Sequence, residues 1–330
     1  MAHQASRDSS AIAVLIEKMS MFQKNVKLSA HSNYRIGGVA DYFYEAHTPE
    51  QISAAMSHWR RYGRGGFFVL GGGTNLLISD AGFKGLVLKP LIKGINIDGN
   101  RVRVGAGTSV KELLEATVSA GLTGLEWAGG LPGTVGGAVR GNAGAFGGEI
   151  KDLISEVVSM DISSKEAKTI TRSADESAFG YRTSYFKEND GKEIILEAVF
   201  NLAPGDPAVI RAAIDEKINY RLARHPMEYP SIGSTFKNVD ARFMPADLLD
   251  KVSHVIKRDP FPVVPTAFLL SEAGLKGVSY GGAMISPKHP NFIVNVLRAS
   301  SEDVRQLIKL AKSEVQKKFG VMIEEEIIYL

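Results

Sequence analysis

The sequence predicts an α+β protein with more than one domain. Its 330 residues exceed what a single compact core usually covers, so two or three domains are expected. Short apolar segments typical of strands alternate with helical segments whose ends carry capping residues. The 44% hydrophobic and 23% charged content is ordinary for a globular chain.

Composition narrows the possible functions. The chain has no Cys, so a disulfide framework, a thiolate metal site and a Cys nucleophile are excluded together. The apolar run from Ala11 to Ile16 is too short for a signal-peptide core, and no segment is apolar enough to span a membrane. The formal charge of +3 is small and both signs are interspersed, which gives little indication of nucleic-acid binding. We therefore expect a soluble cytoplasmic protein.

Capping residues and apolar periodicity predict the main elements. Thr48 precedes a proline, Gln51 stands at the third helical position and Gly63 follows the last turn, so this segment predicts a capped helix. The first 20 residues predict a frayed arm or a brief helix. Expected helices are 48–62, 110–120, one from Asp206 toward Arg221, and 301–319; expected strands are 67–70, 101–104, 156–162, 193–202 and 321–330.

Gly105-Ala106-Gly107 lies between a predicted strand and a predicted helix, as in the Rossmann dinucleotide fingerprint. Glu126 follows about twenty residues on, but the third glycine of the fingerprint is missing. Any tight turn from strand to helix favours glycine. A structural turn is therefore the preferred interpretation.

Two other glycine-rich segments predict a phosphate-binding site. Gly71-Gly72-Gly73-Thr74-Asn75 lies between two apolar strands, and a denser run of glycines extends from Gly129 to Glu149. Without Cβ atoms, such loops let backbone N–H groups approach and surround a pyrophosphate. Simple structural turns are the alternative for each. No Lys follows in the Walker position, so two separate loops favour a dinucleotide over a hydrolysed nucleoside triphosphate.

Other catalytic templates do not match. The seven His residues show no H-E-x-x-H or similar metal-ligand spacing, and the chain has no G-x-S-x-G nucleophile elbow. Hydrolase and metalloenzyme functions are therefore disfavoured, and no metal site is expected.

Six motifs, in order, cover nearly the whole chain from about residue 25. They are Asn33-Tyr34-Arg35-Ile36-Gly37-Gly38, the loop 70–78, the segment 124–149, Tyr181-Arg182-Thr183-Ser184-Tyr185-Phe186-Lys187, the segment 229–238, and Lys288-His289-Pro290-Asn291-Phe292-Ile293-Val294-Asn295. Together they resemble the UDP-N-acetylenolpyruvoylglucosamine reductases, flavoenzymes of peptidoglycan precursor synthesis. The resemblance implies non-covalent FAD, NADPH as co-substrate, and reduction of the enolpyruvyl ether of the UDP-sugar to UDP-N-acetylmuramate. It implies no nucleic-acid, membrane or obligate protein partner.

The resemblance also implies a fold and its boundaries. Two FAD-binding subdomains of the vanillyl-alcohol-oxidase type would precede a C-terminal α/β substrate-binding domain. The expected boundaries are 1–24 for an N-terminal arm, 25–88 and 89–205 for the two subdomains, and 206–330 for the substrate domain. A cap followed by a first-turn proline, Asp206-Pro207, independently makes a domain change near this position plausible.

Three residues match the catalytic motifs of the family. Arg182 would stabilise the negative charge that forms beside the substrate carboxylate, and Ser234 would donate a proton to the carbanion-like carbon. Glu326 would bond that carboxylate if protonated, or orient the arginine. Glu324 and Glu325 remain alternatives to Glu326, because the three glutamates are adjacent. Strand alternation would put Glu324 and Glu326 on one side.

Motif matching supplies the binding residues. Expected cofactor contacts are Gly71, Gly72, Gly73, Thr74, Asn75, Gly130, Pro132, Gly133, Thr134, Gly136, Gly137 and Asn142. Expected substrate contacts are Tyr181, Arg224, Lys237 and Asn238.

The sequence departs from the family pattern in its last third. Val239 replaces a usual proline, the connection 240–264 is longer than usual, and Ile327 and Ile328 stand where a basic residue is common. No clear counterpart of the tyrosine-bearing loop of longer family members is present. The alternatives are another FAD-dependent oxidase of the same superfamily or a non-catalytic flavin-binding module. A flavin tethered through Cys or His is disfavoured, because Cys is absent and neither glycine loop contains His.

Overall fold

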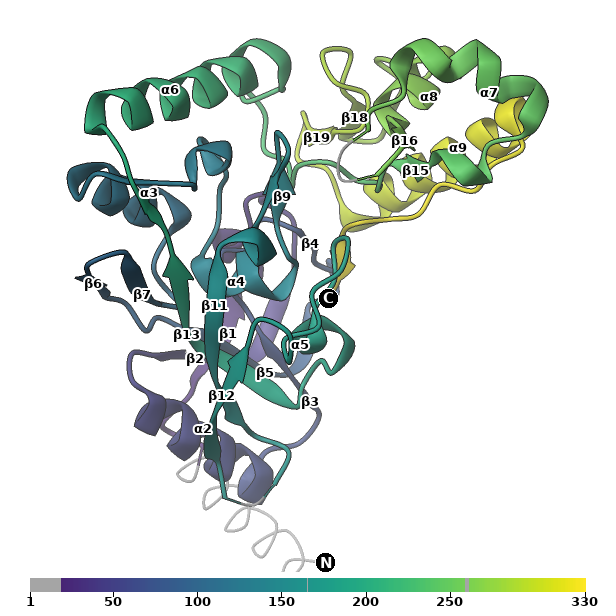
Figure 1. Cartoon of the computed structure of the whole chain (residues 1–330). Helices are drawn as coiled ribbons and strands as arrows, with labels where there is room; N and C mark the ends of the chain where they lie inside the picture. The colour runs from purple at the N-terminus through teal and green to yellow at the C-terminus, as the bar shows by residue number, and fades with distance from the viewer. Residues whose placement is uncertain (1–18, 165, 259–260) are drawn as a thin grey trace, which may run out of the picture.

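Three sheets with three or more strands organise the described part of the chain, as Figure 1 shows for this computed structural model. The structure describes residues 19–164, 166–258 and 261–330. The predicted N-terminal arm lies outside the described residues except for its last few positions. Within the described residues, no helix combines the length and the apolar character that crossing a bilayer would need.

The first sheet has the strand order β1-β2-β5-β3. Its strands are β1 (Gln23–Lys27), β2 (Val39–Ala46), β3 (Gly66–Val69) and β5 (Phe83–Pro90). Strands β2 and β3 both pair parallel with β5, and α2 (Pro49–Tyr62) makes the crossover between them. The Thr48 hydroxyl accepts a hydrogen bond from the Gln51 amide at 3.3 Å, so the predicted capped helix is confirmed.

The second sheet is antiparallel throughout, in the order β12-β11-β13-β7-β6. Its strands are β6 (Ile95–Asp98), β7 (Arg101–Gly105), β11 (Ile154–Asp161), β12 (Lys168–Ser173) and β13 (Glu193–Asn201). Helices α3 (Val110–Ser119), α4 (Val135–Arg140) and α6 (Pro207–Arg224) share a hydrophobic core with this sheet. Because β7 has only antiparallel neighbours, the turn at Gly105 is not a Rossmann nucleotide site, as preferred from the sequence.

Several short elements lie in the connections within these two sheets or lead out of the second. They are η1 (Leu28–His31), β4 (Leu76–Leu77), β8 (Leu122–Thr123), η2 (Glu126–Ala128), β9 (Gly144–Ala145), β10 (Gly148–Glu149), η3 (Ile150–Asp152), α5 (Tyr185–Glu188) and β14 (Ala203–Pro204). Strands β9 and β10 form a hairpin that carries the end of the second glycine segment.

The last third of the chain surrounds a three-stranded sheet, β17-β18-β19. Its elements are β15 (Val239–Asp240), η4 (Ala241–Phe243), α7 (Ala246–Val252), η5 (Ser253–Val255), β16 (Val263–Val264), α8 (Thr266–Glu272), β17 (Ser279–Tyr280), β18 (Ala283–Ile285), β19 (Ile293–Asn295) and α9 (Ser301–Phe319). The predicted stop of α9 is confirmed, since Gly320 takes a φ of 68°.

The predicted terminal strand 321–330 is wrong in its length. Only β20 (Ile328–Tyr329) is a strand, and it pairs parallel with β4, while Glu325 forms an isolated bridge with Phe236. The segment thus pairs with two different partners in succession, so no continuous ladder forms and strict alternation does not hold. In Figure 1 the C-terminus lies near the centre of the molecule, beside β4.

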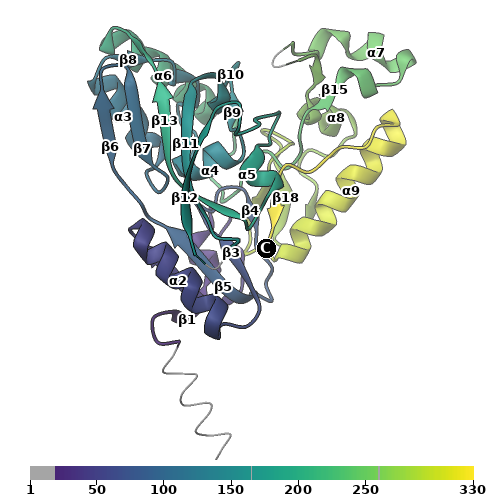
Figure 2. The same cartoon turned by 60° about the horizontal axis from the view of Figure 1, so that its bottom comes forward.

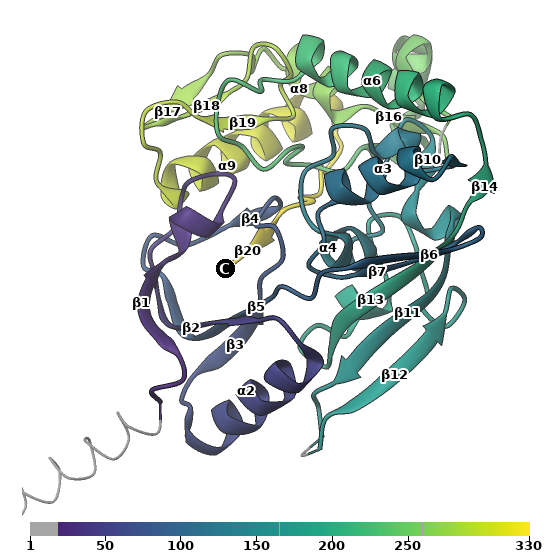
Figure 3. The ribbon, with the colours of Figure 1, turned by 90° about the vertical axis from the view of Figure 1, so that its left-hand side faces the viewer.

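Packing joins the three parts. Trp59 and other residues of α2 share a core with Leu86 of the first sheet and with Met160 of the second. Tyr34, which precedes β2, belongs to the core of the last third, and its hydroxyl donates to the Ile293 carbonyl at 2.8 Å. Figures 2 and 3 show α2 along the first sheet and α9 on the far side of the molecule from the second sheet.

Two histidines lie where α6 leads into the last third. The rings of His225 and His289 are 5.2 Å apart between centroids, and each lies 4.9 Å from the Phe292 ring. Burial lowers the pKa of both histidines to about 4. The neighbouring His289, followed by Arg221 and Lys288, lowers the pKa of His225 further, and Lys257 lowers that of His289.

We expect Tyr34→Phe to lower the unfolding free energy by about 1–2 kcal/mol, because it removes a buried hydrogen bond to the last third of the chain. Urea unfolding of the two proteins measures the difference. Tyr42→Phe in β2 is the matched control, since Tyr42 contributes ring contacts with Phe22 and Trp59 that phenylalanine keeps. Equal effects of the two changes would contradict a role of the Tyr34 hydroxyl.

The two histidines should make the protein less stable in acid. Their folded-state pKa of about 4 lies below the ordinary 6.5, so the unfolded chain takes up these protons first as pH falls. The unfolding free energy should therefore decrease from about pH 6.5 to about pH 4. His289→Gln cannot gain this proton and should reduce the decrease, measured by urea unfolding at several pH values. An unchanged pH profile would contradict the assignment.

Candidate active site

The two glycine-rich loops predicted to bind phosphate lie against each other. A Cβ built on Gly72 would lie 2.7 Å from the Gly133 Cα, and one on Gly133 would lie 2.9 Å from the Thr74 Oγ1. Gly71 faces the Thr134 hydroxyl in the same way, at 3.1 Å. A side chain at position 72 would collide with the backbone of the other loop. The contact between the two loops therefore requires glycine at this position.

The first loop offers donors suited to a diphosphate. In the described part of the chain, none of the backbone N–H groups from Gly71 to Thr74 donates to a backbone acceptor. Gly73 has a φ of 63° and Gly133 one of 110°, conformations that bring successive N–H groups to one side. The residues present therefore fit the diphosphate of a dinucleotide such as FAD.

The remaining predicted cofactor residues support this junction in different ways. The Thr134 hydroxyl caps α4 by accepting from the Gly137 amide at 3.4 Å, and Gly136 packs on Ala106. Asn142 is fully buried, and its side chain bonds Glu149, the Gly180 carbonyl and the Lys151 amide. The amide of Asn142 is thus satisfied within the protein, and Pro132 lies exposed at the edge of the loop.

Arg182 lies at the meeting point of three segments. Its Nη2 donates to the Gly144 carbonyl at 2.8 Å, its Nε lies 3.1 Å from Glu326, and its Nη1 lies 3.5 Å from Glu149. Only 18% of its side chain is exposed. The backbone of Arg182 has a φ of 58°, which is uncommon for a residue with a long side chain, and the Lys187 ammonium donates to its carbonyl at 2.7 Å.

Glu326 is held from two sides. Its amide donates to the Thr235 carbonyl at 2.9 Å, and its own carbonyl accepts from the Asn75 side chain at 3.1 Å. Burial raises the pKa of Glu326 above its ordinary value, and the charges of Arg182 and Lys187 oppose this. The backbone of Glu326 therefore joins the first glycine loop to the loop that contains Ser234, while its carboxylate contacts Arg182.

The other two glutamates of this segment face elsewhere. Glu324 is largely exposed and pairs with Lys237 at 3.1 Å. Glu325 pairs with Lys312 and the Tyr329 hydroxyl. Of the three candidates, only Glu326 contacts Arg182, and the prediction that Glu324 shares its side of a strand is wrong.

The predicted substrate residues divide into two groups. The Arg182 guanidinium carbon lies 5.0 Å from the centroid of the Tyr181 ring. Ser234 and Lys237 lie on either side of Phe236 in the sequence, and Phe236 forms a β-bridge with Glu325. The Asn238 side chain accepts from the Thr266 amide at 3.3 Å. Arg224 lies apart from these residues, at the end of α6, where its guanidinium covers Tyr220 at 4.7 Å.

Sequence reasoning missed several residues around Arg182. Glu149 has only 7% of its side chain exposed and faces the guanidinium, and burial lowers the pKa of Lys187 below its usual range. Both residues lie in motifs identified in the sequence, so their membership of these motifs is the sequence feature that could have indicated a role in the site. Phe261, from the long connection 240–264, lies edge-on to Tyr181 with ring centroids 5.1 Å apart.

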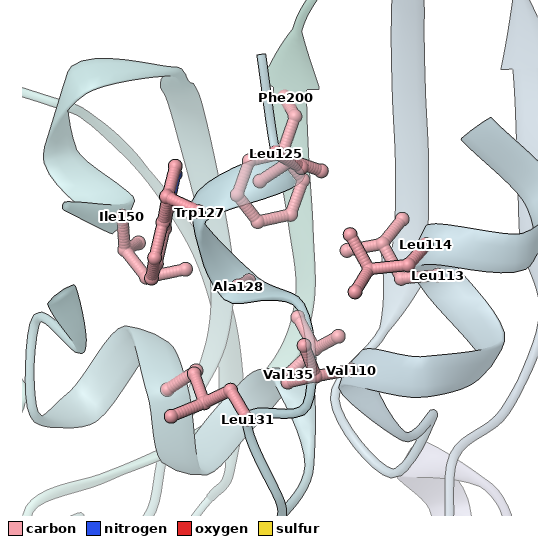
Figure 4. A pocket seen from close by; sticks show the side chains of 11 residues that line it. Val110, Leu113, Leu114, Leu125, Trp127, Ala128, Leu131, Val135, Ile150 and Phe200 are labelled. Carbon is pink, nitrogen blue, oxygen red and sulfur yellow. The ribbon is translucent and has the colours of Figure 1, made fainter. Parts of the chain in front are cut away.

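Two cavities lie outside this group of residues. Figure 4 shows a void of about 10 Å³ between α3, α4 and β13, lined only by apolar side chains such as Leu114, Trp127 and Phe200. It has the size of about one water molecule and lacks polar partners, so it is a packing defect of the core. A surface groove of about 510 Å³, lined in part by Arg35 and Arg298, includes none of the predicted catalytic residues.

Comparison with known proteins gives two family matches. A profile described as the C-terminal domain of UDP-N-acetylenolpyruvoylglucosamine reductase matches residues 225–330. A profile described as an FAD binding domain matches residues 40–171.

Curated relatives match over nearly their full length. A UDP-N-acetylenolpyruvoylglucosamine reductase of Clostridium botulinum is 36% identical over 312 residues, covering 94% of this chain and 93% of the relative. One of Carboxydothermus hydrogenoformans is 37% identical over 309 residues, covering 92% and 93%. A crystal structure of the reductase from Thermus caldophilus superposes with a TM-score of 0.73 and 28% identity, covering 93% of this chain and 99% of that one.

Proposed function

The chain belongs to the UDP-N-acetylenolpyruvoylglucosamine reductase family, and from this we propose that Arg182, Ser234 and Glu326 carry out its catalysis. The substrate is the enolpyruvyl ether of the UDP-sugar and the product is UDP-N-acetylmuramate. The contact of Arg182 with Glu326 at 3.1 Å, beside the joined glycine loops, carries the assignment. We further propose units at 25–88, 89–205 and 206–330, and a cytoplasmic location.

The two glycine loops would hold the diphosphate of FAD through the N–H groups of Gly71 to Thr74 and through Gly133. When bound, the flavin accepts electrons from NADPH and supplies hydride to the enolpyruvyl carbon. The chain's own task is then to stabilise charge and to place a proton.

Arg182 would stabilise the developing negative charge. Addition of hydride to the terminal carbon of an enolpyruvyl group pushes charge through the next carbon onto the carboxylate. A guanidinium fixed by Gly144 and Glu326 needs little reorganisation as that charge forms. Because two carboxylates, Glu149 and Glu326, already face this cation, protonation of Glu326 would free the guanidinium for the substrate carboxylate.

Ser234 would supply the proton. Ser234 is half-buried, and the carbonyl of its neighbour Thr235 accepts a hydrogen bond from the Glu326 amide at 2.9 Å. A serine is a weak acid in water, but an enolate carbon is a strong base, so a hydroxyl held in line suffices. Tyr181, Lys237 and Asn238 lie close enough to this loop to contact the sugar or its phosphates, and Arg224 would reach a more distant part of the UDP group.

Ser234→Ala should leave reduction of the flavin by NADPH near normal and slow its reoxidation by the UDP-sugar by at least about 10²-fold, as loss of a general acid implies. Anaerobic stopped-flow absorbance near 450 nm measures each half-reaction separately. Ser231→Ala, in the same loop, is the control. Equal slowing of both half-reactions would refute the assigned role.

Arg182→Gln should keep the FAD content of the purified protein and slow reoxidation by the UDP-sugar by about 10²- to 10³-fold, the usual effect of losing an oxyanion-stabilising group. Arg298→Gln is the matched control, because Arg298 also has a positive φ, of 53°, but lies outside the candidate site. Loss of bound flavin from Arg182→Gln alone would instead place Arg182 in the cofactor site.

A further inference from the structure

Lys187 lies in α5, and its side chain reaches back to the turn that presents Arg182. The Lys187 ammonium donates to the Arg182 carbonyl at 2.7 Å. The Gly180–Thr183 bridge closes the same turn, in which Arg182 takes a φ of 58°. Such a backbone conformation is uncommon for a residue with a long side chain and persists only where neighbouring contacts enforce it. The hydrogen bond from Lys187 is therefore one of the contacts that fix how the Arg182 side chain leaves the turn.

The helix that carries Lys187 is held independently of the lysine side chain. The buried Ser184 hydroxyl accepts from the Lys187 amide at 3.4 Å and donates to the Arg140 carbonyl at the end of α4, at 2.7 Å. Phe186 of α5 is buried in the core of the second sheet. These contacts use the Lys187 backbone or neighbouring residues, so they remain when the ammonium is replaced.

The charge of Lys187 has no carboxylate partner. Among the residues that the structure describes, no Asp or Glu forms a salt bridge with its ammonium, although the side chain is half-buried. Three neighbouring cations each pair with a carboxylate: Arg140 with Asp190 at 3.0 Å, Lys237 with Glu324 at 3.1 Å, and Arg182 with Glu326 at 3.1 Å. Lys187 therefore contributes a positive charge to this region that no adjacent acid cancels.

This charge acts on Glu326. Burial raises the pKa of Glu326, and the positive charge of Lys187 is one of those that oppose the rise. In turn, Glu326 opposes the lowering of the Lys187 pKa by burial and by Lys237 and Arg140. The ionisable groups around the Glu326 carboxyl are Arg182, Lys187, Lys237, Tyr181 and, across the guanidinium, Glu149. Of the cations in this set, only Lys187 lacks another carboxylate of its own among the described residues.

We propose that Lys187 is a positioning residue for reduction of the UDP-sugar: its ammonium holds the turn that presents Arg182, and its unpaired charge favours the ionised form of Glu326. This inference rests on the proposed function, in which Arg182 and Glu326 act on the substrate carboxylate. There, Glu326 either pairs with the guanidinium or, when protonated, releases it. Lys187 would thus help to set the pH at which Arg182 becomes available to the substrate.

Three substitutions separate the hydrogen bond from the charge. Lys187→Gln keeps an N–H donor without the charge, Lys187→Arg keeps both, and Lys187→Met loses both. Lys187→Met should slow anaerobic reoxidation of the flavin by the UDP-sugar by about 10- to 100-fold, because a displaced Arg182 loses its alignment with the substrate. Flavin reduction by NADPH should stay near normal. Lys187→Gln should recover much of the lost rate, and Lys187→Arg nearly all of it, measured by stopped-flow absorbance.

The pH profile of reoxidation tests the role of the charge. Loss of the Lys187 charge should raise the pKa of Glu326 still further, because one of the opposing cations is removed. The pH midpoint of the reoxidation rate should therefore move to higher pH in Lys187→Met and Lys187→Gln and stay in place in Lys187→Arg. Lys192→Met is the matched control, since Lys192 is exposed and bonds only Asn189, at 2.9 Å, so rate and midpoint should both be unchanged.

The outcomes separate failure of this proposal from failure of the proposed function. A Lys187→Met protein with the wild-type rate and midpoint, beside a slow Arg182→Gln protein, would overturn only the role of Lys187. Equal slowing of both half-reactions with an unmoved midpoint would also overturn it and make Lys187 structural. An Arg182→Gln protein that is reoxidised as fast as the wild type would contradict the proposed function itself.

Discussion

The candidate site depends on how the segment around Glu326 is held. Its carbonyl accepts from Asn75 in the first glycine loop, its amide donates to Thr235 beside Ser234, and its carboxylate meets Arg182. Two residues later β20 joins β4, directly after that loop. The end of the chain therefore fixes the distance between the cofactor loops and the proposed proton donor. A change in this pairing would move the charged group and the acid together.

Charge balance distinguishes Arg182 from Arg221, the arginine in the last turn of α6 that contacts Gly129. Arg182 is compensated by two carboxylates before any ligand binds, so its position is stable and its charge is available only when one carboxylate is protonated or displaced. Arg221 has no such partner among the described residues. An arginine that is already paired with carboxylates is held in place for a transition state. An arginine without such a partner in a low-dielectric region gains most from binding an anion.

The sequence predicted those features that depend on local chemistry. The caps of α2 and α9 were predicted correctly because Thr48, Gln51 and Gly320 act on their own turns. The terminal strand was predicted too long, since Phe236 and β4, its successive partners, lie far away in the sequence. Recognition of the glycine loops needed only composition, but their contact through Gly72 and Gly133 is a tertiary property.

The same reasoning explains which features near the glycine loops the sequence did not predict. Arg221 follows the pattern of an ordinary cation in the last turn of a helix, which sequence alone interprets as favourable and solvated. Its burial against Gly129 depends on how α6 packs on η2, and no local pattern encodes that packing. The motif that contains Arg182 was recognised, but the choice of Glu326 over its neighbours required the fold.

The backbone at Arg182 shows how strongly its position is determined. A φ of 58° in a residue other than glycine costs of the order of 1–3 kcal/mol and persists only when surrounding contacts enforce it. Here the Gly180–Thr183 bridge closes the turn, Lys187 holds the Arg182 carbonyl, and Gly144 holds the guanidinium. Two of these three contacts involve the backbone of the turn, so they remain when the guanidinium is removed. Variants at this position should therefore keep the turn while they lose the charge.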